Sequence, residues 1–236
     1  KFGDLSNGTD EVAGRAVFWR GRLYSRDGKY AQAANALRTA TDKEWYKKGF
    51  PAKGGKKAPT IVADIDFEYA NALMLQKAPN WMLALQFLQR VQARRGDYSQ
   101  MPEVFSQQAI CQHKLKQFEP SRRTTERFIA AYAQHKLIAD IRFLHAENLF
   151  LLNRLDESII AYQAFLAAHK AHENQLAAQF RIAQVHHHKR AWGESNKLAV
   201  PLLGKKPEGR LFDQLSFVVG ENYFREGKWE QAITPF

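Results

Sequence analysis

The sequence lacks the features of disulfide-stabilised, membrane-spanning and loop-rich proteins. Among its 236 residues there is a single cysteine, Cys111, so no internal disulfide framework can form. No stretch approaches the roughly 20 consecutive apolar residues that a bilayer-spanning helix needs. Glycine and proline are few and scattered, whereas Ala, Leu, Gln, Lys, Arg and Glu dominate. Because these residues favour helices, the composition predicts an all-α fold.

The N-terminus has no signal-like pattern, but the chain begins at Lys1 rather than Met, so this absence carries no conclusion about targeting. A single thiol is compatible both with the cytoplasm and with a periplasm whose proteins do without disulfides. The sequence therefore leaves the localisation open between the bacterial periplasm or envelope and the cytoplasm.

Positive charge is concentrated near the start of the chain. The formal net charge is +11, and residues 1–60 carry 13 Lys and Arg against 6 Asp and Glu. Much of the excess lies in residues 43–60, where glycines and prolines disfavour a helix interior. We interpret this segment as an exposed basic loop inserted into the fold. Because Trp45, Tyr46 and Phe50 lie among its lysines, nucleic-acid or anionic-surface binding is an alternative function.

Three columns of residues repeat along the chain with one period of 37 residues. A small residue recurs at Gly21, Ala72, Ala109, Ala146, Ala183 and Gly220. A bulky residue follows nine positions later, at Tyr30, Trp81, Phe118, Leu155, Trp192 and Trp229. A second small residue follows twelve positions after the first, at Ala33, Ala84, Ser121, Ser158, Ser195 and Ala232. Only the first interval, of 51 residues, departs from the period, and the basic segment accounts for the difference.

The columns predict stacked helix hairpins. Small residues let two antiparallel helices approach closely, and the bulky residue after the turn fills the junction between them. Gly28 and Gly227 lie in the expected turns, where glycine can adopt a positive φ at little energetic cost. One hairpin cannot bury its apolar face alone, so stacked copies must share a continuous core.

These residues resemble the tetratricopeptide repeat (TPR) family. The last copy reads Gly220-x2-Tyr223, then Gly227-Lys228-Trp229, then Ala232-x3-Phe236, and the first copy has the same pattern from Gly21. The resemblance implies a right-handed α-solenoid of about six hairpins, although the period is 37 rather than the family's 34. The longer loops are similar to those of bacterial envelope-associated members. The predicted units lie near 14–42, 65–101, 102–138, 139–175, 176–212 and 213–236, the last incomplete, with 43–60 as the inserted loop.

The resemblance also implies a binding groove lined by the first helices. The fifth position of each unit would face it and is aromatic in five of six copies. Polar residues follow at neighbouring positions, basic in the early units and partly acidic later. The carboxylate clamp of chaperone-binding members is not matched, since Arg22 and Phe18 stand where it has Asn and Lys. The predicted groove residues are Phe18, Arg22, Arg26, Tyr69, Phe143, Glu147, Phe180, Gln184, Phe217 and Glu221.

The sequence predicts a protein–protein interaction scaffold and no enzyme. Its partner would be a protein or peptide with acidic character, an oligomer is compatible with the array, and no cofactor is implied. The fifth-position aromatics have an alternative interpretation, which is packing against the neighbouring helix. A further alternative is that the array forms the non-catalytic arm of a larger enzyme.

Residues that could suggest chemistry have simpler interpretations. His186, His187 and His188 are consecutive, so on a helix they point in directions about 100° apart and cannot share one metal ion. His169 and His172 have no thiolate or carboxylate companion nearby in the sequence. Cys111 is expected to be a small core or groove residue rather than a nucleophile.

Overall fold

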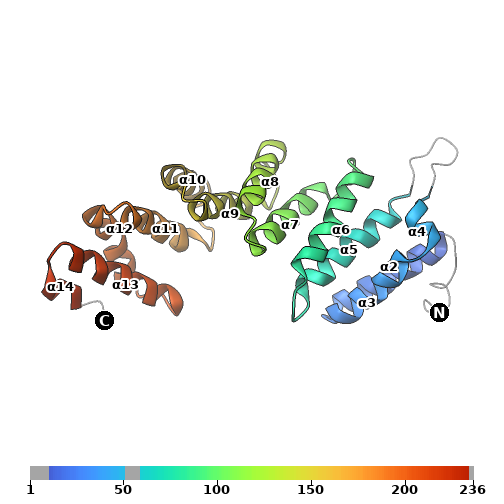
Figure 1. Cartoon of the computed structure of the whole chain (residues 1–236), viewed down its shortest axis with the longest axis horizontal. Helices are drawn as coiled ribbons and strands as arrows, with labels where there is room; N and C mark the ends of the chain where they lie inside the picture. The colour runs from blue at the N-terminus through green and yellow to red at the C-terminus, as the bar shows by residue number, and fades with distance from the viewer. Residues whose placement is uncertain (1–10, 51–58, 234–236) are drawn as a thin grey trace. The chain divides into compact units, whose positions relative to one another are not determined.

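The computed structural model describes residues 11–50 and 59–233, and every regular element in these ranges is an α-helix (Figure 1). This confirms the predicted all-α solenoid of helix hairpins. The first helices of the hairpins are α2 (Glu11–Arg26), α5 (Ile61–Leu75), α7 (Met101–Lys114), α9 (Ile138–Leu151), α11 (Gln175–His188) and α13 (Arg210–Arg225). The second helices are α3 (Tyr30–Thr41), α6 (Trp81–Arg94), α8 (Phe118–Ala131), α10 (Leu155–Ala168), α12 (Trp192–Gly204) and α14 (Trp229–Ile233).

The helices group into two compact units, Lys1–Thr124 (unit 1) and Thr125–Phe236 (unit 2). The boundary between them falls inside α8. One short additional helix, α4 (Glu44–Lys48), follows α3 in unit 1. Each unit is described below by itself.

The bulky column marks where each second helix begins. All six of its members, from Tyr30 to Trp229, are the first residue of a second helix. Two residues earlier the backbone adopts a positive φ at Gly28, Lys116, Asn153, Arg190 and Gly227, between 59° and 73°. The turn of the second hairpin differs, because Pro79 cannot adopt that conformation. There the Asn80 side chain caps α6 by accepting a hydrogen bond from Leu83 N at 3.0 Å.

The two columns of small residues pack the helices of a hairpin together. A Cβ atom on Gly21 would lie 2.4 Å from the side chain of Leu37, so α2 and α3 touch too closely there for any larger residue. In other hairpins the second column adds a polar link. The Ser195 hydroxyl donates to the Ala183 carbonyl at 2.8 Å, and Ser121 and Ala109 form the same contact. Each serine is thus buried without an unsatisfied hydroxyl.

The inserted segment is only partly the exposed loop expected from the sequence. Residues 51–58 of this prediction lie outside the described residues. Residues 44–48, however, form α4, and the side chains of Trp45 and Tyr46 are only 6% and 2% exposed. Trp45 packs against Gly14 of α2 and stacks on Phe50, with ring centroids 5.9 Å apart. The prediction of an exposed loop was wrong here, because burying two large aromatic side chains stabilises the fold more than leaving them exposed to solvent.

Tyr46 also completes a buried polar network. Its hydroxyl donates to the carboxylate of Asp66 on α5, and Arg94 of α6 lies 3.7 Å from the other carboxylate oxygen. Asp66 is fully buried, and burial raises the pKa of its carboxyl to about 6. The network ties the additional helix to the second hairpin of unit 1.

None of the described helices combines the length and apolar character that crossing a bilayer would require.

Candidate protein-interaction surfaces

The predicted aromatic stripe does not form a continuous exposed surface. Tyr69 and Phe180 are 3% and 2% exposed, so both belong to the core of their units. Phe143 is partly buried against Tyr162 and Phe165, with ring centroids 6.1 and 5.5 Å away. We therefore correct the prediction for Tyr69 and Phe180, which pack against neighbouring helices, whereas the part of Phe143 in binding stays a prediction.

The other two predicted aromatics behave differently. Phe18 is half-buried, with its ring 5.4 Å from that of Trp19. Phe217 is 57% exposed. Neither is sealed inside its unit, and their part in binding stays a prediction.

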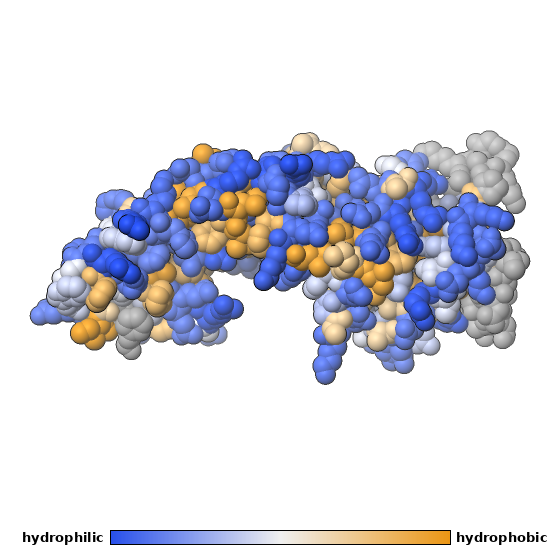
Figure 2. All heavy atoms as spheres, viewed as in Figure 1, coloured by the Kyte–Doolittle hydropathy of each residue, from blue (hydrophilic) through white to orange (hydrophobic). Residues whose placement is uncertain are grey.

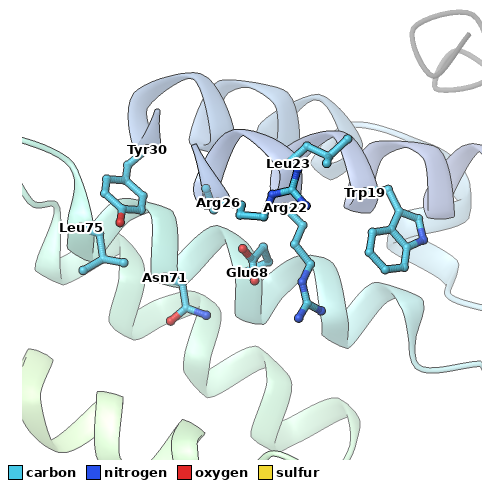
Figure 3. A pocket seen from close by; sticks show the side chains of 9 residues that line it. Trp19, Arg22, Leu23, Arg26, Tyr30, Glu68, Asn71 and Leu75 are labelled. Atoms are coloured by element: carbon cyan, nitrogen blue, oxygen red, sulfur yellow. The ribbon is translucent and has the colours of Figure 1, made fainter. Parts of the chain in front are cut away.

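A hollow in unit 1 brings together two of the predicted basic residues, Arg22 and Arg26 (Figure 3). It has a volume of about 450 Å³ and lies where α2, the start of α3 and α5 meet. In Figure 3 the Arg22 side chain projects from α2 towards the part of α5 that carries Glu68 and Asn71. The lining residues are Trp19, Arg22, Leu23, Ser25, Arg26, Tyr30, Glu68, Asn71 and Leu75.

The chemistry of this hollow combines apolar surface with positive charge. Trp19 and Leu75 are 48% and 58% exposed, which is unusual for large apolar side chains. Arg22 and Arg26 are exposed and form no ion pair within the described part of the chain. The Arg22 guanidinium carbon lies 5.8 Å from the ring of Trp19, a cation–π distance that restrains the side chain. We name this surface the basic hollow.

In unit 2 the predicted groove residues Glu147 and Gln184 are held by an arginine that the sequence analysis did not single out. Arg181 of α11 donates two hydrogen bonds to the Glu147 carboxylate of α9, at 2.7 and 2.9 Å, and one to Gln184 at 2.7 Å. The Tyr162 hydroxyl donates to the same carboxylate. Glu147 therefore joins successive hairpins, and its charge is already neutralised.

A signal for this contact was present in the repeat. Arg181 lies 34 residues after Glu147, three less than one period. Other polar contacts between successive hairpins have similar separations, such as Gln107 with Asn71 at 36 residues and His187 with Asn222 at 35. Polar pairs slightly less than one period apart are thus candidates for contacts between hairpins.

Glu221, the last predicted groove residue, pairs with Arg225 one turn later at 2.8 Å. It lines a second hollow, of about 470 Å³, at the α13–α14 hairpin. A third hollow, of about 500 Å³, lies among α8, α9 and α10 of unit 2, in the region where Figure 2 shows gathered apolar surface. Its most exposed large apolar residue is Ile160, at 66%. The sequence signal for it was the pair Ile159-Ile160, which makes α10 apolar on more than one face.

The histidines and the cysteine have separate structural environments. The His187 ring is hydrogen-bonded to Asn222 at 2.6 Å, and His188 lies against Phe150. Cys111 is buried, and burial raises the pKa of its thiol to about 12, so the reactive thiolate is disfavoured. Within residues 11–50 and 59–233 no group of three or more His, Cys, Asp or Glu side chains is placed to hold a metal ion.

Two of the three aromatic residues that suggested nucleic-acid binding are not available to stack on bases. Trp45 and Tyr46 are buried in unit 1 and cannot stack on bases. Phe50, the third, is stacked on Trp45.

Comparison with known proteins identifies the fold. No protein-family model matches the sequence, and no curated protein matches it. Solved structures do match. A tetratricopeptide repeat protein from Parabacteroides merdae is 14% identical with a TM-score of 0.68, and the match covers 94% of this chain and 77% of that one. The chain has the tetratricopeptide-repeat fold.

Two further TPR-fold matches agree. MamA of AMB-1 is 14% identical with a TM-score of 0.60, covering 87% of this chain and 98% of that chain. The TPR-like repeats of a Podosopora anserina putative kinesin light chain are 16% identical with a TM-score of 0.57, covering 80% and 92%. The resemblance drawn from the repeat columns is therefore confirmed at the level of the fold.

Proposed function

We propose that the chain is a non-catalytic protein-interaction scaffold that binds an acidic peptide segment in the basic hollow of unit 1. The TPR fold supports the general part of this proposal, since proteins of this fold are typically scaffolds. The basic hollow supports the specific part.

One observation carries the proposed ligand chemistry. Arg22 and Arg26 lie beside the exposed apolar side chains of Trp19, Leu23 and Leu75. A peptide that places an aliphatic or aromatic residue on Trp19 can direct a neighbouring carboxylate to either guanidinium, which binds carboxylates in a bidentate manner. Glu68 is the one acidic residue in the lining, so positive charge predominates.

Panning a random peptide library against the whole chain would test this proposal. We expect the selected peptides to pair Asp or Glu with a large apolar residue. Their binding should weaken as salt is raised, because exposed charges are screened. For a selected peptide, the double substitution Arg22→Ala/Arg26→Ala should weaken binding roughly tenfold or more.

The matched control removes two exposed arginines elsewhere, Arg38 and Arg210, and should leave peptide affinity unchanged. Selected peptides without acidic residues, or equal binding by both double variants, would show that the basic hollow is not the binding site.

A further inference from the structure

The hollow among α8, α9 and α10 has properties that the proposed function does not use. Its volume is about 500 Å³, and all of its lining residues belong to unit 2. Described hairpins lie on both sides of it along the chain, and two of its three helices are second helices, so it is distinct from the groove of first helices predicted from the sequence. We call it the alanine groove. Its apolar lining residues are Ile129, Ala130, Leu149, Ile160, Ala161 and Ala164.

Small side chains on α10 make the alanine groove deep. Ala161 and Ala164 correspond to Leu198 and Pro201 of α12, which lie 37 residues later. The alanines therefore leave space where the next hairpin has bulkier side chains. Beside them, Ile160 is 66% exposed. α10 thus offers an apolar ridge and, next to it, room for an apolar side chain of a partner.

The two walls of the groove follow helix axes. Thr125 of α8 lies 3.0 Å from the His145 ring of α9, and the Phe165 ring of α10 has its centroid 5.5 Å from that of Phe143 of α9. These contacts place α8 and α10 antiparallel to α9 on either side of it. Lining residues recur three or four positions apart on both walls, at Glu126, Ile129 and Ala130 of α8 and at Glu157, Ile160, Ala161 and Ala164 of α10. Ridges with this spacing accept the side-chain ridge of a third helix.

Arg142 of α9 supplies a cation at one end of the groove. Its side chain is partly buried, and its Nε atom is buried without a hydrogen-bond acceptor among the described residues. A buried charged donor without an acceptor is unfavourable, so a carboxylate brought by a ligand would stabilise it. The corresponding residue of the next hairpin is the neutral Gln179. The cation is therefore a property of this groove and not of every hairpin.

The other end of the groove is acidic. Leu149 follows Arg142 on α9 by seven residues, which is about two helical turns. At this end Glu157 lines the groove and is paired with Arg154 at 2.6 Å, and α8 adds the carboxylate of Glu126. A ligand that complements both ends carries an acid and a base about two turns apart, with apolar side chains between them. A helix can present such a row of side chains, whereas an alkyl chain with one carboxylate has no group for the acidic end.

We propose that the alanine groove binds one face of an amphipathic helix of a partner protein. The helix places apolar side chains, three or four residues apart, over Ala161 and Ala164. An acidic side chain of the helix accepts hydrogen bonds from Arg142. A basic side chain about seven residues away lies at the end that carries Glu126 and Glu157.

A displayed library of 12-residue helical peptides, built on an alanine-rich scaffold, would test the proposal. The target is the whole chain carrying Arg22→Ala/Arg26→Ala, so that the basic hollow of unit 1 does not select acidic peptides. We expect enrichment of an acid and a base about seven residues apart, in either order, with large apolar residues between them. Fluorescence anisotropy of a selected, labelled peptide then gives its affinity.

Three substitutions in the groove should weaken binding of the selected peptide. Ala161→Leu fills the hollow with the side chain that Leu198 carries one period later, and Ile160→Asp places a charge on the exposed ridge. We expect each to lower affinity at least tenfold. Arg142→Gln should lower it about tenfold, but should have little effect on the same peptide with its acid replaced by glutamine, because the lost contact is the same one.

The matched controls are Ala168→Leu, on the same helix outside the groove, and Arg210→Gln, an exposed arginine of α13. Both should leave peptide affinity unchanged. Thermal melts by circular dichroism would verify that all variants are folded, and Ile160→Asp alters an exposed side chain, so the test does not depend on Ala161→Leu alone.

Four results would overturn the proposal. The library could yield no enriched peptide, or the selected peptides could bind Ala161→Leu and Ile160→Asp as tightly as the parent. Binding of dodecanoate in the groove without any peptide would assign it to an alkyl carboxylate. Sedimentation velocity that shows self-association lost in Ile160→Asp would assign it to a second copy of the chain. Because the target lacks Arg22 and Arg26, none of these results decides whether the basic hollow binds a peptide.

Discussion

At the scale of single residues, Phe180 and Phe217 have the same place in successive hairpins and opposite environments. Phe180 packs among Leu202, Leu215 and Val218, because α13 follows it. Phe217 is mostly exposed, because no described helix covers it. Side-chain identity alone therefore says little about whether an aromatic at this position stabilises the fold or contacts a partner.

This contrast gives a matched pair of substitutions. Phe180→Ala should lower the free energy of unfolding by about 3–4 kcal/mol, because it leaves a cavity in a packed cluster. Phe217→Ala should change it by no more than about 0.5 kcal/mol. Urea unfolding followed by circular dichroism would measure both. Similar losses for the two variants would mean that Phe217 is also covered in solution.

Asp66 is a second residue whose role comes from its surroundings. In the folded chain burial raises its carboxyl pKa to about 6, from an ordinary value near 3.8. Between these pH values the folded state holds a proton that the unfolded state has released. The stability that this group contributes is thus present at low pH and is lost as pH rises through about 6.

Asp66→Asn should remove this dependence while keeping an acceptor for the Tyr46 hydroxyl. The free energy of unfolding of the variant minus that of the wild type should rise by about 2.4 kcal/mol between pH 4 and pH 8. Denaturant unfolding at several pH values would measure it, with the exposed Asp213→Asn as the control. A difference that does not vary with pH would show that the Asp66 carboxyl titrates normally.

At the scale of elements, the turns between paired helices share one backbone conformation in every hairpin except the second. Five of them place a residue with positive φ two positions before the second helix, and in three this residue is not glycine. Lys116 and Arg190 are strained in this conformation, whereas Asn153 is a residue type that tolerates it. The turns thus keep their geometry even where the sequence does not favour it.

Lys116→Gly should relieve this strain and raise the free energy of unfolding by about 0.5 kcal/mol. Asn153→Gly should raise the free energy of unfolding by less, because asparagine tolerates a positive φ better than lysine does. Urea midpoints at an unchanged m-value would measure the two effects. A loss of stability in Lys116→Gly would indicate that the lysine side chain stabilises the turn by more than the backbone strain costs.

The additional helix α4 could not be predicted from its composition. Its five residues, Glu44–Lys48, contain two lysines and precede a glycine, which is typical of a loop. Its stability comes from tertiary contacts, since the Arg94 guanidinium lies over the Tyr46 ring at 5.2 Å and donates to the Tyr46 carbonyl at 3.3 Å. Helices this short are not stable without such packing.

At the scale of the whole molecule, the chain is a TPR array whose contacts are made between neighbouring hairpins. The links that join them are specific, such as Arg181 with Glu147 in unit 2 and Gln107 with Asn71 in unit 1. The proposed peptide binding uses the basic hollow of unit 1.

Sequence alone determined the period, the hairpins and the all-α fold. These follow from local chemistry, because small residues, bulky residues and turn residues recur in one register and act within a single hairpin. Only the tertiary structure decided which aromatics are buried, that Trp45 and Tyr46 pack inside unit 1, and that Arg181 neutralises Glu147. These features depend on side chains contributed by other helices, and burial is a property of both partners in a contact rather than of one residue type.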